Sequence, residues 1–88
     1  MGTVSIPLND NRRAVIDAAD FERVNAYCWH YHEADIYGSA YVFRNVDGRT
    51  AQRLECFLLG LPPLVPWVRF KNGDVKDCRR ANMEVKRG

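Results

Sequence analysis

The chain lacks several features that would place it in a specialised class of protein. Although 47% of its 88 residues are hydrophobic, no stretch approaches the ~18 apolar residues of a membrane-spanning helix. The start, Met1-Gly2-Thr3-Val4, has neither the basic and apolar regions of a signal peptide nor a myristoylation signal. Its three cysteines form no CxxC pair, and an odd number argues against a disulfide framework. We therefore expect a cytoplasmic protein with reduced thiols and no membrane association.

The chain also has little excess charge, because 13 Lys and Arg stand against 11 Asp and Glu for a net charge of +2. That total is too small to identify a nucleic-acid binder. The distribution is more informative, since the part from Arg69 onward holds seven Lys and Arg but only three Asp and Glu. A basic segment of this kind suits phosphate contact. It is equally typical of a solvated helix whose basic end complements the helix dipole.

Hydrophobic alternation and turn residues in the first half predict a small antiparallel sheet with one short helix. Residues 4–17 have the pattern of a hairpin around an Asn-Asp-Asn turn. A short helix capped by Asp17 or Asp20 is expected next. Strands are then expected over residues 28–32 and 40–45, and the second leads into an Asp-Gly turn.

The second half has helix and strand signals that are separated by proline. Thr50 either starts a strand or leads directly into a helix over residues 52–59, which Gly60 closes. The three prolines that follow force an extended connection. A short strand is expected over residues 68–70, and a last helix over residues 79–84. The whole pattern is that of one α+β domain.

The most specific motif lies between residues 54 and 83, where the chain reads LECFLLGLPPLVPWVRFKNGDVKDCRRANM. An apolar helix-like run ends in Gly-Leu-Pro-Pro, an Asn72-Gly73-Asp74 turn follows, and then comes Asp-Cys-Arg-Arg-Ala-Asn. This layout resembles the C-terminal half of phage and bacterial HNH homing endonucleases, the ββα-metal family. The N-terminal half resembles a leader that is common before HNH modules. Together the two resemblances cover approximately residues 4–85.

The resemblance implies one domain over residues 1–88. Residues 1–50 would form the leader sheet, and residues 51–88 a helix followed by an HNH-like ββα unit. That unit, at about residues 66–85, would pack against the preceding helix.

In the HNH family a His acts as general base, while a carboxylate and an Asn hold one divalent metal ion. The resemblance places the carboxylate position on Arg69, the general base on Phe70, and the metal-binding Asn on Asn82. The positions that correspond to the family's active site are Glu55, Cys56, Arg69, Phe70, Cys78 and Asn82. Because Phe70 cannot accept a proton and Arg69 would repel a cation, we expect no catalytic residue, metal or cofactor. Asn82 is then either a remnant of the metal site or a polar residue near a turn.

The first functional interpretation is a degenerate HNH-like domain that binds nucleic acid, DNA rather than RNA, without cleaving it. The residues expected to contact phosphates are Arg69, Lys71, Lys76, Arg79 and Arg80. Trp67 and Phe70 flank Arg69, and at least one of them is expected in the core.

A second interpretation is a protein-interaction module, either an inhibitor or accessory factor of phage or host-defence origin, or a homodimer. A third is an active nuclease with an unconventional site, in which His30 or His32 acts together with Asp74 and Asn82. Separately, Cys28, His30 and His32 alternate along a predicted strand, so that they would offer three ligands to zinc. The same alternation fits a half-exposed strand without a metal.

Overall fold

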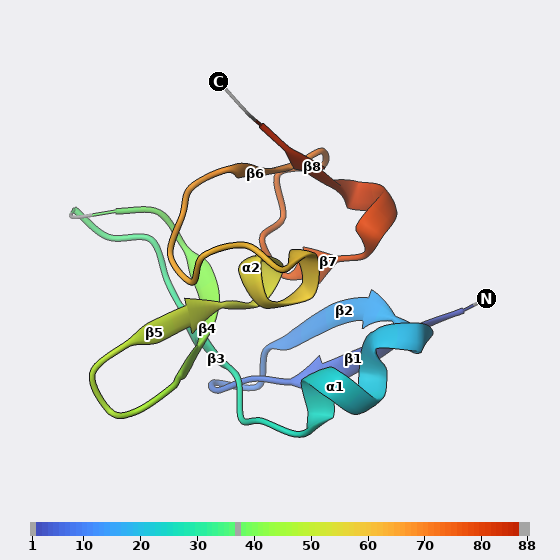
Figure 1. The fold of residues 1–88 in the computed structure, drawn as a ribbon, viewed down its shortest axis with the longest axis horizontal. Helices are drawn as coiled ribbons and strands as arrows, with labels where there is room; N and C mark the ends of the chain where they lie inside the picture. The colour runs from blue at the N-terminus through green and yellow to red at the C-terminus, as the bar shows by residue number, and fades with distance from the viewer. Residues whose placement is uncertain (1, 37, 87–88) are drawn as a thin grey trace.

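The computed structural model describes residues 2–36 and 38–86, and it confirms an α+β fold with N-terminal antiparallel strands and a short helix (Figure 1). The strands are β1 (Thr3–Pro7), β2 (Arg13–Asp17), β3 (His30–His32), β4 (Tyr41–Asn45), β5 (Ala51–Arg53), β6 (Val68–Phe70), β7 (Asp77–Cys78) and β8 (Met83–Val85). The helices are α1 (Phe21–Asn25) and α2 (Leu54–Leu59), and two 3-10 turns are η1 (Ala18–Asp20) and η2 (Arg80–Asn82). Among the described residues, no helix is long and apolar enough to span a bilayer.

The first sheet joins the two ends of the chain in the order β1-β2-β7. β1 and β2 form the predicted antiparallel hairpin, with Ile6 opposite Ala14. β7 then pairs with β2 in parallel, with Ile16 opposite Cys78 (Figure 1). All four of these side chains are buried. The C-terminal segment is therefore part of the same sheet as the N-terminal hairpin.

The second sheet is an antiparallel arrangement of β3, β4 and β5. The turn between β4 and β5 follows the predicted Asp-Gly signal, because Gly48 adopts a φ of 82°, which favours glycine. The Asp47 carboxylate accepts hydrogen bonds from the backbone N–H groups of Arg49 and Thr50 at 3.0 and 2.9 Å. β5 continues directly into α2, which ends at Gly60 with a φ of 68°.

One core lies between the three sheets and the two helices. The indole N–H of Trp29 donates a hydrogen bond of 2.8 Å to the Val24 carbonyl, which ties the end of α1 to the start of the second sheet. The buried core residues are Ile6, Ala14, Ile16, Val24, Trp29, Val42, Leu54, Leu58, Cys78 and Met83. Because these come from all three sheets and both helices, the elements depend on each other for burial.

The helix predicted over residues 79–84 is wrong. After β7 the chain makes a single 3-10 turn, η2, and then forms β8, which pairs antiparallel with β6. Met83 is buried and Glu84 is exposed, which is the two-residue period of a strand. The second strand of the expected ββα unit, β7, pairs with β2, so β6 and β8 alone make a two-stranded ribbon.

The predicted helix cap is also wrong. Neither Asp17 nor Asp20 accepts a side-chain capping hydrogen bond from the helix that follows it. The Asp20 carboxylate instead accepts hydrogen bonds from the Arg80 guanidinium, at 3.0 and 3.1 Å. The same guanidinium donates to the Leu58 carbonyl at 3.2 Å. Arg80 therefore connects η1, α2 and η2.

We predict that Asp20→Ala lowers the free energy of unfolding by about 1–3 kcal/mol, since charged hydrogen bonds have about this value. Asp20 is only 5% exposed, and its hydrogen bond with Arg80 lowers its pKa. The lowered pKa makes this stabilisation complete above the ordinary Asp pKa of about 4 and lost as the pH falls. Urea unfolding of both proteins at neutral and acidic pH measures the difference, which should shrink in acid. Glu22→Ala, an exposed acidic position on α1, is the control, and equal losses in both variants would contradict this role.

Candidate functional site

Four of the five predicted phosphate-binding residues pair with acidic groups of the same chain, and three of these pairs lie off the β6–β8 ribbon. The Arg79 guanidinium makes two hydrogen bonds of 2.7 Å to the Asp77 carboxylate, and these lower the pKa of Asp77. Lys76 lies 3.3 Å from the Asp74 carboxylate, and its ammonium is 5.0 Å from the centre of the Tyr31 ring. Together with the Arg80 contacts described above, these pairs give the three cations a role in holding the C-terminal segment.

The other two predicted residues lie on the outward face of the β6–β8 ribbon. Along β6 the side chains alternate, so that Arg69 and Lys71 are exposed while Val68 and Phe70 pack against the core. Trp67 shares the outward side and is 42% exposed. The expectation that at least one of the two aromatic residues belongs to the core is therefore confirmed.

Lys86 also lies on this outward side, although it is not among the residues predicted to contact phosphates. The ribbon register continues so that Lys86 is opposite Trp67, and its N–H donates to the Trp67 carbonyl. Directly opposite residues of an antiparallel pair share one face. We call Trp67, Arg69, Lys71 and Lys86 the ribbon face. In Figure 1 the ribbon lies on the side of the molecule away from α1.

The only acidic residue opposite these side chains on the ribbon is Glu84, which pairs with Arg69 at 3.3 Å. Both side chains are about half exposed, at 54% and 49%. Exposed pairs of this kind contribute only about 0–1 kcal/mol. The Arg69 guanidinium can therefore exchange Glu84 for an external anion at little cost.

The positions that correspond to an HNH active site do not form an open site. Phe70 is directed inward and Arg69 outward, on opposite faces of one strand. Glu55 and Cys56 are buried in α2, and Cys78 is buried in β7. Burial, followed by the charge of Glu55, raises the pKa of Cys56 to about 11. Burial raises the pKa of Cys78 as well, so both thiols stay protonated at neutral pH and pack as small apolar groups.

Asn82 has a structural role in the turn before β7. Its side-chain amide donates to the Asn72 side-chain oxygen and to the Asp77 carbonyl, each at 2.9 Å. Its own oxygen accepts from the Asn72 backbone N–H at 3.1 Å. Since Asn82 is only 5% exposed, it closes the loop between β6 and β7 from within.

Within the described part of the chain, no group of three or more His, Cys, Asp or Glu side chains is placed to hold a metal ion. His30 and His32 do share one face of β3, since their rings pack against Phe43 and Tyr41 of β4. The distances between ring centres are 5.6 Å for His30 and Phe43 and 4.9 Å for His32 and Tyr41. Cys28 is exposed before the strand begins. His32 also lies 3.2 Å from the Asp35 carboxylate. The side chains of the unconventional nuclease site are thus engaged elsewhere: His32 with Asp35, Asp74 with Lys76, and Asn82 in its loop.

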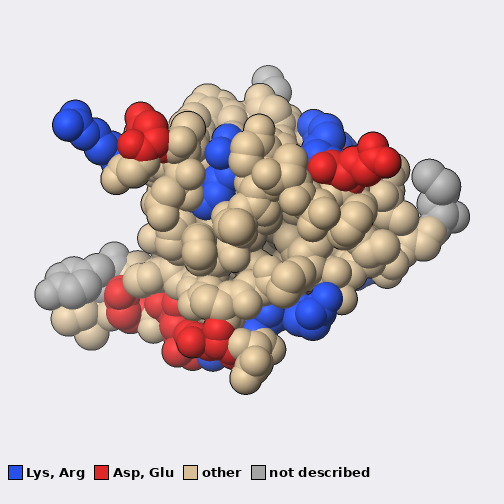
Figure 2. All heavy atoms as spheres, turned by 90° about the horizontal axis from the view of Figure 1, so that it is seen from below, with Lys and Arg blue, Asp and Glu red and all other residues tan. Residues whose placement is uncertain are grey.

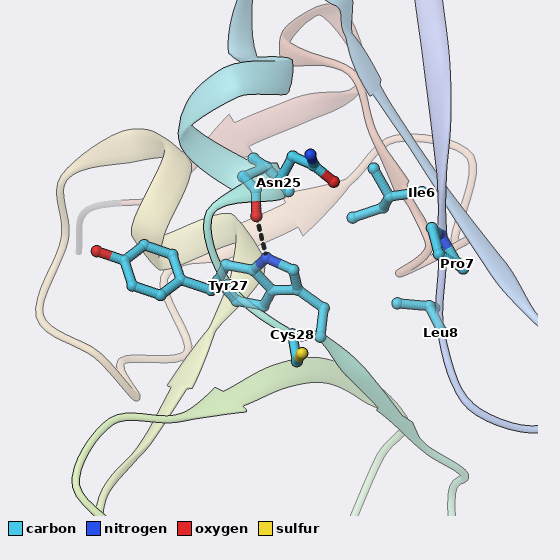
Figure 3. A pocket seen from close by; sticks show the side chains of 8 residues that line it. Ile6, Pro7, Leu8, Asn25, Tyr27 and Cys28 are labelled. Atoms are coloured by element: carbon cyan, nitrogen blue, oxygen red, sulfur yellow. Dashed lines mark hydrogen bonds between the residues drawn. The ribbon is translucent and has the colours of Figure 1, made fainter.

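An apolar pocket of about 330 Å³ lies between β1 and α1, and no pattern in the sequence predicted it. Figure 3 shows Ile6 and Pro7 of β1, together with the adjacent Leu8, on one side of the pocket, across from Asn25. The pocket is lined by Ile6, Pro7, Leu8, Val24, Asn25, Tyr27, Cys28 and Trp29. Its lining is suited to an apolar group rather than to a phosphate.

Charges of both signs are interspersed on the face that Figure 2 shows, where basic and acidic side chains lie next to one another. This view contains no broad surface of one sign. Electrostatic attraction of a nucleic acid to this face is therefore weak, and binding there depends on local groups.

No family model, curated protein or solved structure matches this chain. The similarity to HNH endonucleases thus remains a resemblance of motifs, and the function is argued from the geometry.

We predict that Asn82→Ala lowers the free energy of unfolding by about 1–3 kcal/mol, because it leaves buried backbone groups without a partner. Chemical denaturation followed by circular dichroism measures this loss. Asn45→Ala, at an exposed position of β4, is the matched control and should change little. Wild-type stability in the Asn82 variant would show that these hydrogen bonds do not hold the loop.

Proposed function

We propose that this protein binds nucleic acid through its ribbon face and does not hydrolyse it, with DNA preferred to RNA. The observation that carries the proposal is an exposed row on and beside β6: Arg69 lies on the strand, Trp67 and Lys71 flank it, and Lys86 is across from Trp67. An aromatic ring stacks on a base or sugar whatever the sequence, while neighbouring cations contact phosphates. These are the components of binding with little sequence preference.

The geometry gives the predicted cations two different roles. Arg69 and Lys71 belong to the proposed binding surface, because they are exposed on the ribbon. Lys76, Arg79 and Arg80 lie off the ribbon, and each pairs with a carboxylate of this chain, so they are assigned to the fold. Arg69 also pairs with a carboxylate, Glu84, but that pair lies about half exposed on the ribbon itself. A cytoplasmic location, which three free thiols favour, is part of this proposal.

Wild-type protein should not nick supercoiled plasmid in Mg²⁺ or Mn²⁺. A missing general base typically costs about 10²–10⁴-fold in rate, and Arg69 replaces the metal-binding carboxylate of the motif it resembles. Gel electrophoresis after prolonged incubation tests this, with a mock purification as control for contaminating nucleases. Metal-dependent nicking that purified Asn82→Ala lacks would overturn the assignment.

Binding should fall by about thirtyfold on Trp67→Leu, the middle of the range for one base–aromatic stack. Arg69→Gln and Lys71→Gln should each reduce the slope of log Kd against log salt by roughly one unit. Trp67 also provides a direct signal, because Trp29 is buried and nucleic acid should quench mainly the exposed ring.

The matched controls for these variants are Arg49→Gln, at an exposed position in the turn between β4 and β5, and Arg79→Gln, which removes a cation held by Asp77. Neither should change affinity by more than about twofold, since neither lies on the ribbon face. Equal losses of affinity in the four variants that remove a cation, two on the ribbon face and two controls, would mean that net charge, not this surface, determines binding.

The second candidate is a protein-interaction module, and the observation that favours it is the apolar pocket between β1 and α1 (Figure 3). A partner's apolar side chain fits such a pocket. Absence of nucleic-acid binding at low salt would favour this candidate. Sedimentation analysis over a range of concentrations would then test the homodimer.

A further inference from the structure

The second sheet has one face that does not contribute to the core. Val42, in the middle of β4, is fully buried. Its neighbours Tyr41 and Phe43 must lie on the opposite face, because successive strand residues alternate. Both are partly exposed, and neither is among the hydrophobic residues that pack against the core. Burial of apolar surface in the described fold therefore does not account for their position.

Aromatic side chains cover this outer face from strand to strand. His30 is opposite Phe43, and His32 is opposite Tyr41. The rings of Tyr41 and Phe43 are themselves 5.4 Å apart. With the two contacts between β3 and β4 given above, the four rings form one continuous layer.

A cation completes this layer from β5. Arg53 is opposite Phe43, and its guanidinium carbon lies 4.8 Å from the centre of the Tyr41 ring. This is the range of a cation–π contact. We call His30, His32, Tyr41, Phe43 and Arg53 the ring face.

A polar pocket of about 350 Å³ adjoins one end of the ring face. It is lined by His32, Asp35, Gly38, Ser39, Tyr41 and Arg53. The Arg53 Nε is a buried donor that has no hydrogen-bond partner among the described residues. Buried donors are nearly always paired, so this one is unusual. Arg53 as a whole is partly exposed and lines the pocket, so its guanidinium is suited to an acceptor oxygen from outside the chain.

We infer that the ring face binds single-stranded nucleic acid, whose unpaired bases stack on Tyr41 and Phe43. Arg53 then donates to a phosphate or base oxygen seated in the adjoining pocket. Sheet-borne aromatic side chains stack on splayed bases in this way, whereas a duplex hides the faces of its bases. This inference rests on the proposed function and deepens it, because it specifies a single strand as the partner and adds a second surface to the ribbon face.

The test measures fluorescence anisotropy with labelled 12-residue oligothymidine and oligouridine, and with a duplex of equal length. Tyr41→Leu and Phe43→Leu keep an apolar side chain and remove the ring. Each should raise the Kd for the single strands by about 5- to 150-fold, the range expected for one lost stack, and leave the duplex unchanged. Tyr27→Leu is the matched control, because it removes an exposed ring that packs on Phe57 and Arg44 and should have no effect.

A second measurement does not depend on the folding of the variants. Wild-type protein is cross-linked by ultraviolet light to an oligonucleotide that contains 5-bromouracil, and the modified peptide is found by mass spectrometry. The expected adduct lies on residues 41–43. An adduct confined to Trp67 would overturn the inference about the ring face.

The outcomes separate the two proposals. If the wild type binds neither single strands nor duplex at low salt, both the proposed function and this inference fail. If Trp67→Leu weakens binding while the two β4 variants bind like the wild type, the proposed function stands and the ring face is overturned. If the β4 variants lose single-strand and duplex binding equally, specificity for single strands is overturned.

Discussion

The contact between Asp20 and Arg80 joins groups that are 60 residues apart, and the position of the C-terminal segment depends on it. The Arg80 backbone N–H also donates to the Asp17 carboxylate at 3.1 Å. These hydrogen bonds hold η2 against the end of β2, beside the short parallel pairing of β2 with β7. A two-residue strand has few ladder hydrogen bonds of its own, so the charged contacts fix where β8 begins. The ribbon and its exposed side chains are thus placed by a partly buried ion pair in another part of the fold.

Much of the fold could be predicted because its signals are local. The N-terminal hairpin, the Asp-Gly turn and the helix end at Gly60 each follow from the backbone preferences of a few adjacent residues. The prediction of a last helix was wrong because residues 79–85 have no local strand signal beyond Met83 and Val85. The strand conformation of β8 comes from its pairing with β6. The predicted cap failed for the same reason, because the Asp20 carboxylate binds the distant Arg80 rather than the end of a helix. Contacts across such distances leave no periodic pattern in the sequence.

The candidate site was predictable in composition but not in arrangement. The sequence shows that cations are concentrated after residue 69, but it does not show which carboxylates neutralise them. Arg79 and Arg80 are adjacent, and yet they pair with Asp77 and Asp20 in different elements. Lys86 was missed because its place opposite Trp67 depends on the ribbon register. The ring face was missed for a related reason. The sequence shows the alternation within each β-strand, but it does not show which β-strands are neighbours in the sheet and so share a surface.

The inward position of Phe70 and the exposure of Trp67 are connected through the alternation of β6. A strand that directs Phe70 into the core must direct Arg69 and Trp67 outward. A catalytic His at position 70 would have to stay accessible to water and metal, whereas Phe70 packs against the buried residues and stabilises the ribbon in one orientation. The packing of Val68 and Phe70 against the core thus holds Trp67 and Arg69 on the opposite, exposed side of the strand. Restricting the backbone before binding lowers the entropy lost when exposed side chains bind, so the packing of Phe70 preorganises the surface proposed to bind nucleic acid.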